Sequence, residues 1–105
     1  MHIIRYEELE SHCVLEFCYS IRYPNFWNVD SIYVDYDDFV SLCPYLEKVI
    51  PDYKYFAPQY MRNDEWSRIE SLALADGIPG TFFQEVHAWK EKDPEQKDFF
   101  WIYGV

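Results

Sequence analysis

The fold predicted from this sequence is decided by Thr81-Phe-Phe-Gln-Glu-Val-His-Ala-Trp-Lys90, a polar break, and Lys97-Asp-Phe-Phe-Trp-Ile-Tyr103. The break, residues 91–96, contains an Asp-Pro pair, which is typical of a turn. The second arm, residues 99–103, is apolar at every position, and a strand that does not alternate is usually covered on both faces. We therefore predict a β-hairpin over residues 81–103, with its second arm as an inner strand of a sheet.

Two more strands are predicted in the first third of the chain. Residues 13–21 alternate with a period of two, which indicates a strand with one face in the core. Residues 31–35 form a second, shorter strand, and the two are expected to pair around the loop of residues 22–30, which contains a Tyr-Pro-Asn turn signal. Residues 2–11 fit the start of a strand or a helix equally well.

Two helical regions follow. Apolar residues recur at helical spacing over residues 37–50, where Pro44 predicts either a kink or two short helices with Pro44 in the first turn of the second. Residues 63–76 have matching start and stop signals, with acids in the first turn and Gly77 at the C-terminal cap position. Residues 52–62 are predicted to be an irregular connection.

These elements predict an α+β fold in one domain over residues 1–105. An antiparallel sheet of about four or five strands would carry the two helices, residues 37–50 and 63–76, on one face. Aromatic residues make up 21% of the 105 residues. Because aromatic side chains bury large areas, a chain of this length can form a compact core without disulfides or a metal.

The formal net charge of −10 limits the classes of partner. Nucleic acids and anionic membranes need a basic face, so neither is expected to bind. The charge favours a basic protein partner, although acidity also confers solubility. The sequence shows no secretory pattern and no apolar run long enough to span a membrane. With an odd count of three cysteines, a cytoplasmic protein with reduced thiols is expected.

One segment combines acids with aromatic residues and is the candidate partner-binding site. No basic residue lies between Arg22 and Lys48. Unpaired carboxylates complement Lys and Arg, and Tyr and Trp are favoured interface anchors. The alternative is that the aspartates cap a helix while the aromatics fill the core. The predicted contact residues are Trp27, Asp30, Tyr33, Asp35, Asp37 and Asp38.

Metal and cofactor sites are not expected. The spacing of the potential zinc ligands is poor, because the sequence has neither a Cys-x-x-Cys pair nor a His-x-x-x-His pair. A calcium loop starting at Asp35 would need Gly at position 40 and Glu at position 46, where the chain has Val and Leu. Three scattered glycines cannot build a phosphate-binding loop. The potential zinc ligands are His12, Cys13, Cys18, Cys43 and His87.

The leading functional prediction is a stoichiometric binding protein rather than an enzyme. An immunity protein or antitoxin that presents carboxylates to the active site of a basic, nuclease-like toxin fits the charge. One alternative is a small enzyme or ligand-binding domain that uses Cys43, His87 and Glu85 in an aromatic cleft. A second alternative is a structural subunit of an oligomer, in which exposed aromatics form a self-complementary patch.

Overall fold

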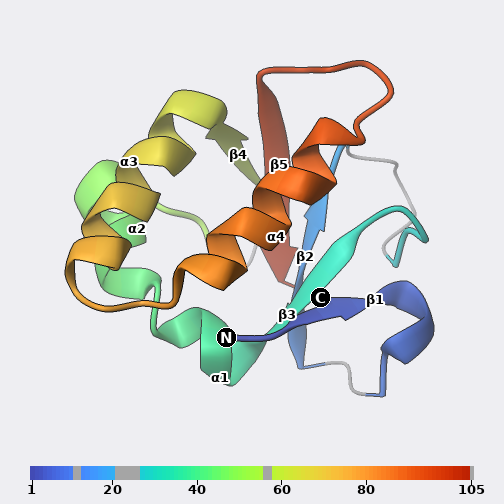
Figure 1. Cartoon of the computed structure of the whole chain (residues 1–105), viewed down its shortest axis with the longest axis horizontal. Coiled ribbons are helices and arrows are strands. Elements are labelled where there is room, and N and C mark those ends of the chain that lie inside the picture. The colour runs from blue at the N-terminus through green and yellow to red at the C-terminus, as the bar shows by residue number, and fades with distance from the viewer. Residues whose placement is uncertain (11–12, 21–26, 56–57, 105) are drawn as a thin grey trace.

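In the part of the chain that the structure describes, five antiparallel strands and four α-helices form an α+β fold, as predicted (Figure 1). The computed structural model describes residues 1–10, 13–20, 27–55 and 58–104. The strands are β1 (Ile3–Arg5), β2 (Val14–Cys18), β3 (Ile32–Asp35), β4 (Gln59–Arg62) and β5 (Phe99–Gly104). The helices are the 3-10 helix η1 (Tyr6–Glu8) and the α-helices α1 (Tyr36–Val40), α2 (Cys43–Val49), α3 (Asn63–Ala75) and α4 (Gly80–Glu91).

The sheet has the strand order β1-β3-β2-β5-β4. Strand β5 pairs with β2 on one side and β4 on the other, which confirms the prediction of an inner strand. Strands β2 and β3 pair antiparallel, with Phe17 opposite Ile32, so that prediction is also confirmed. Position 21 and the turn signal at residues 23–25 lie outside the described residues. Strands β1 and β4 form the two edges.

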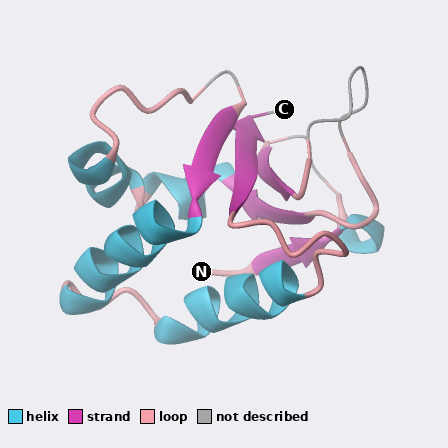
Figure 2. Ribbon diagram, turned by 90° about the horizontal axis from the view of Figure 1, so that it is seen from above, coloured by secondary structure: helices cyan, strands magenta, loops and turns pink. Residues whose placement is uncertain are grey.

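The core lies between the helices and one face of the sheet. Register places Phe17 opposite both Ile32 and Ile102, so these apolar side chains share a face. The ring of Phe17 contacts the rings of Trp89 on α4 and Phe100 on β5. Figure 1 shows α4 crossing in front of β2 and β5, and Figure 2 shows the helices gathered to one side of the strands. The predicted packing of helices on one face is therefore confirmed.

The predicted first arm of the C-terminal hairpin is wrong, because residues 80–91 form helix α4. Phe82, Phe83, Val86 and Trp89 are all buried, and their spacing of one, three and three residues places them on one side of a helix. Aromatic and β-branched residues favour strands locally, but burial of this whole helical face outweighs that preference. The remaining arm is β5, which β2 and β4 flank.

The other predicted helices are confirmed, with small changes of boundary. Pro44 lies in the first turn of α2, and a break at residues 41–42 separates α2 from α1. Helix α3 begins at Asn63, and its N-terminal turn is closed by the Glu65 carboxylate, which accepts a hydrogen bond from the Arg62 N–H at 3.0 Å. The irregular connection predicted over residues 52–62 is partly wrong, because residues 59–62 form β4.

Gly77 ends α3 in a left-handed conformation, with φ of +92°. The N–H groups of Gly77 and Ile78 donate to the carbonyls of Leu74 and Ala73, both at 3.1 Å, which is a Schellman ending. We expect Gly77→Ala to lower the free energy of unfolding by about 1 kcal/mol, because a Cβ disfavours positive φ. Urea denaturation should measure this loss. An unchanged midpoint would show that the turn relaxes without strain.

Candidate functional site

Strand β3 divides the predicted acidic segment into two groups. Asp30 precedes the strand, and its backbone carbonyl accepts a hydrogen bond from Trp89 Nε1 at 2.8 Å, close to the end of α4. Asp35 ends the strand, and Asp37 and Asp38 follow in α1. At about 3.3 Å per residue, β3 spans about 10 Å from Ile32 to Asp35, and Asp30 lies before its start. The structure therefore brings three of the four predicted aspartates together and places the fourth at the other end of β3.

The three aspartates around the start of α1 do not cap that helix. Asp35 occupies the N-cap position without a side-chain hydrogen bond to the helix, and Asp37 is exposed. Asp38 Oδ2 accepts a hydrogen bond from the backbone N–H of His2 at 3.3 Å. Among the described residues, no ion pair joins any of the three to a basic side chain. A hydrogen-bonded side-chain cap is therefore absent at α1, although Asp37 and Asp38 lie in its first turn, where acids favour the helix dipole.

Acids from the N-terminal segment join this group. Strand β1 pairs antiparallel with β3, with Ile3 opposite Val34 and Arg5 opposite Ile32, and the chain then returns to β2, whose Val14 lies opposite Asp35. Glu8, Glu10 and Asp35 line one hollow of about 590 Å³, which we call the acidic hollow. The acids at positions 7, 8 and 10 are visible in the sequence as a negatively charged segment. Their proximity to Asp35 depends on strand pairing between residues far apart in the chain. The acidic hollow is lined by His2, Ile4, Glu8, Leu9, Glu10, Val14 and Asp35.

Tyr33 does not lie on the surface, which corrects its assignment as a contact residue. Its side chain is fully buried, and its hydroxyl donates to the carbonyl of Asn28 at 2.7 Å. Burial, followed by the nearby Glu16 carboxylate, raises the pKa of Tyr33, so the hydroxyl remains a donor at neutral pH. Trp27 stacks on Tyr33, with ring centroids 5.8 Å apart, and is itself half-buried. Tyr33 therefore supports Trp27 instead of reaching a partner.

Glu16 holds this loop in place, and the sequence analysis did not single it out. It lies on β2, faces away from the helices and is fully buried. Its carboxylate accepts hydrogen bonds from the N–H of Trp27 at 2.8 Å, from the N–H of Asn28 at 3.1 Å and from Ser31 Oγ at 2.6 Å. Asn28 Nδ2 donates a fourth, at 3.0 Å. The signal was a glutamate within the apolar run Val14-Leu15-Glu16-Phe17-Cys18, since buried acids are rare without partners.

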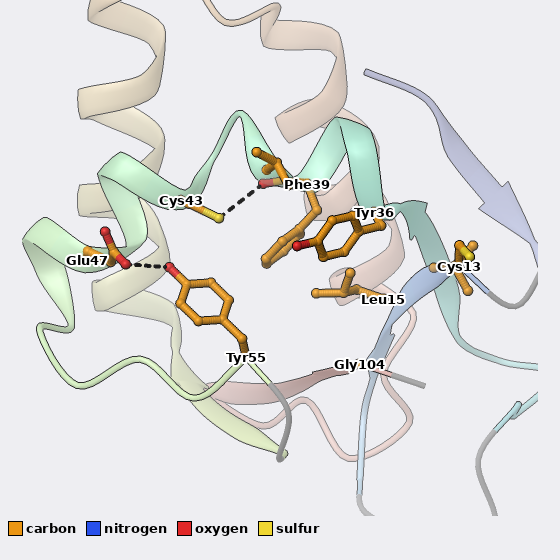
Figure 3. A pocket seen from close by; sticks show the side chains of 10 residues that line it. Cys13, Leu15, Tyr36, Phe39, Cys43, Glu47, Tyr55 and Gly104 are labelled. Atoms are coloured by element: carbon orange, nitrogen blue, oxygen red, sulfur yellow. Dashed lines mark hydrogen bonds between the residues drawn. The ribbon is translucent and has the colours of Figure 1, made fainter.

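The structure does not bring Cys43, His87 and Glu85 together. Cys43 lines a cavity of about 700 Å³ below α1 and α2 (Figure 3), whereas His87 lines a different hollow and binds Glu70 on α3 at 2.6 Å. Glu85 is exposed on α4. Glu85 and His87 both lie in α4, and residues two apart on a helix point about 200° from each other, so the two side chains face different directions.

Metal ligands do not gather within residues 1–10, 13–20, 27–55 and 58–104, where no group of three His, Cys, Asp or Glu side chains could hold an ion. His12, one potential ligand, lies outside those ranges. In the same ranges, no helix is both long and apolar enough to cross a membrane.

Comparison with protein-family models, curated proteins and solved structures finds no match to this chain.

Proposed function

We propose that this chain is an acidic stoichiometric binding protein, of the immunity protein or antitoxin kind, that occludes the active site of a basic, nuclease-like toxin. One observation carries the proposal. Asp35 and Asp37 lie at the start of α1 and neither caps the helix, and among the described residues neither forms an ion pair. Carboxylates that neither cap the helix through a hydrogen bond nor form an ion pair remain available to Lys and Arg of another protein.

Neighbouring acids add to the same negative potential. Glu8 and Glu10 line the acidic hollow together with Asp35, while Asp38 contacts the backbone of His2 at its border. A nuclease site that holds phosphates is lined by basic side chains, so a surface of carboxylates competes with the nucleic acid for that site. Like-charged groups fixed side by side also raise the rate of encounter with a cationic protein, most strongly at low salt.

The half-buried Trp27 and the nearby Asp30 would extend the contact to the other end of β3. Trp27 has a rigid support, because its ring stacks on Tyr33 and its N–H is held by Glu16. An aromatic ring held in this way loses little conformational entropy on binding, which is the usual property of an interface anchor. In this proposal the aspartates control association rate, and Trp27 contributes contact area.

The proposal predicts that charge reversal at α1 abolishes binding to the toxin. A chain carrying Asp35→Lys, Asp37→Lys and Asp38→Lys would be used as bait beside the wild-type chain, at about 50 mM and about 300 mM salt. We expect the wild-type chain to retain a basic protein more strongly at low salt, and the variant to lose it at both. The retained protein would then be assayed for nuclease activity with and without one equivalent of the wild-type chain.

A matched control separates the location of charge from its amount. Asp52, Glu85 and Glu91 are exposed on other parts of the surface, and their replacement by Lys changes the net charge of −10 by the same amount. We expect this control to retain the basic protein. If both variants lost the basic protein equally, total charge and not the location of the aspartates would control binding. If one equivalent of the wild-type chain left the nuclease activity of the retained protein unchanged, the proposed inhibitory role would be contradicted.

A further inference from the structure

We propose that the cavity below α1 and α2 is a binding site for a small organic ammonium ion with a flat apolar body. The cavity has a volume of about 700 Å³, within the range of about 300–1,000 Å³ typical of small-molecule sites. Figure 3 shows side chains from β2, α1, α2 and the segment before β4 pointing towards the same space. Its lining residues are Cys13, Val14, Leu15, Tyr36, Phe39, Val40, Cys43, Glu47, Tyr55 and Gly104.

The floor and the mouth of the cavity differ in polarity. Leu15 and Phe39 are buried and form an apolar floor, while Tyr36, Val40 and Glu47 are exposed and border the mouth. Tyr36 is 53% exposed and Val40 is 45% exposed, so two large apolar side chains meet water at this point. Exposed apolar groups around a concave apolar surface are typical of a ligand site.

The polar groups at one end of the cavity favour a positively charged ligand. Tyr55 OH donates to Glu47 Oε1 at 3.0 Å (Figure 3). Burial, followed by hydrogen bonding with Cys43 and Glu47, raises the pKa of Tyr55, so its hydroxyl remains protonated at neutral pH. This bond uses one lone pair of Glu47 and orients the carboxylate, whose remaining lone pairs can accept hydrogen bonds from an ammonium group.

The lining disfavours anions and favours a cation with an aromatic or aliphatic body. None of the described lining residues is Lys, Arg or His, so a carboxylate or phosphate would meet only Glu47 and a chain of net charge −10. The rings of Tyr36, Phe39 and Tyr55 offer aromatic faces for both apolar contact and cation–π attraction.

Close backbone contact helps to shape one end of the site. A Cβ on Gly104 would lie 2.9 Å from the carbonyl oxygen of Tyr55, closer than real side chains approach a backbone. The absence of a side chain at position 104 therefore lets the end of β5 lie against the segment that carries Tyr55. The cavity is built from elements that the sheet and α2 hold together, independent of any protein partner.

The test uses three probes that share a naphthylmethyl group and differ in the charge of the polar group attached to it. 1-Naphthylmethylamine, 1-naphthylmethanol and 1-naphthylacetate would each be titrated into the ¹⁵N-labelled chain at pH 7, with chemical-shift changes followed by NMR. We expect shifts that map to Leu15, Val40, Cys43 and Tyr55, and an amine that binds about threefold to fivefold tighter than the alcohol. The carboxylate should bind more weakly than both.

Variants locate the site and the source of its charge preference. Glu47→Gln should remove the advantage of the amine and leave binding of the alcohol unchanged. Val40→Trp should weaken all three probes at least about tenfold, because an indole would fill the mouth. Leu72→Trp is the matched control, since Leu72 is similarly exposed but lies on α3, and it should bind like the wild type.

Several outcomes would overturn the proposal. These are equal affinity for the amine and the carboxylate, shifts that map to other residues, no saturable binding of any probe, or unchanged binding by folded Val40→Trp. Circular dichroism of each variant would establish that it is folded. Because no partner protein takes part, failure here leaves the proposed inhibitory function untouched, and the reverse also holds.

Discussion

Replacing Glu16 by Ala is expected to lower the free energy of unfolding by about 3–5 kcal/mol, since several buried donors lose their acceptor at once. The Glu16 carboxylate accepts four hydrogen bonds, from the backbone N–H groups of Trp27 and Asn28, from Asn28 Nδ2 and from Ser31 Oγ. An ionised carboxylate only accepts hydrogen bonds, so this set of donors matches it fully. Alanine supplies no acceptor, and water reaches the site only if the loop of residues 27–31 opens.

Glu16→Gln separates lost volume from lost hydrogen bonding. The amide keeps the shape of the side chain but replaces one carboxylate oxygen with an NH₂ group, which then faces hydrogen-bond donors. We therefore expect a smaller loss of unfolding free energy, of about 1–3 kcal/mol. Urea denaturation measures both losses. Amide hydrogen exchange at Trp27 and Asn28 should become faster than exchange in β2 and β5, which would show local opening of the loop.

The exposed Glu85→Ala is the control and should change stability by less than about 0.5 kcal/mol. If Glu16→Ala unfolded at the wild-type urea concentration with Trp27 and Asn28 still protected, the role given to Glu16 would be wrong. A destabilised loop would also displace Trp27 and Asp30. Loss of partner binding by Glu16→Gln would then report on the loop, because the buried Glu16 cannot itself touch a partner.

Replacing Asp93 by Asn is expected to lower the free energy of unfolding by about 2–3 kcal/mol at neutral pH. Asp93 is 1% exposed in the loop between α4 and β5. Its carboxylate accepts hydrogen bonds from the N–H of Glu95 at 3.0 Å and from Lys97 Nζ at 3.2 Å, and Lys90 Nζ lies 3.6 Å away. An amide would place an NH₂ group against at least one of these donors and would leave the two lysines without their anion.

The effect of Asp93 should depend on pH in a defined direction. Burial by itself would raise its pKa, but the hydrogen bonds from Glu95 and Lys97 outweigh burial and hold the pKa below the ordinary value of 3.8. A carboxyl group whose pKa is lower in the folded state stabilises that state above the unfolded pKa, and this contribution is lost as pH falls through the folded pKa. The stability difference between wild type and Asp93→Asn should therefore be constant above about pH 5 and shrink below about pH 4.

Thermal or urea denaturation between pH 2.5 and pH 7 would measure this dependence. Glu95→Gln is the matched control, because Glu95 is exposed and, among the described residues, its side chain pairs with the Lys97 ammonium group at 3.2 Å. That variant should lose less than about 1 kcal/mol. A stability difference for Asp93→Asn that stayed the same down to pH 2.5 would contradict the lowered pKa.

Local signals in the sequence predicted secondary structure correctly where start, stop and apolar patterns all favoured the same element. Helix α3 has acids at its start, an apolar stripe and Gly77 just beyond its end, and the structure differs from the prediction by only one residue. Pro44 predicted the break between α1 and α2 because a proline cannot donate within a helix. Local signals were insufficient for residues 81–90, where aromatic and β-branched residues favour a strand locally but the segment forms helix α4.

Only some residues of the candidate binding site could be predicted from the sequence, because their exposure and their neighbours depend on tertiary contacts. The aspartates at positions 35, 37 and 38 were identified from charge, but their exposure depends on whether α1 uses them as caps, and it does not. Glu8 and Glu10 lie beside Asp35 because β1 and β2 both pair with β3 and the segment between β1 and β2 returns to the Asp35 end. The burial of Tyr33 was missed because residues 27–31 fold back over the sheet face that lacks helices, with Glu16 as their anchor.

The amino-acid sequence by itself determined the α+β class, the antiparallel pairing of β2 with β3, the inner position of β5 and the surplus of negative charge. These features depend on alternation, apolar runs and composition, which act over a few neighbouring residues or over the whole chain. Only the tertiary structure decided that residues 80–91 are a helix, that Glu16 is buried, and that an apolar cavity lies below α1 and α2. Each of these depends on contacts between residues far apart in the chain, whose burial outweighs local preference.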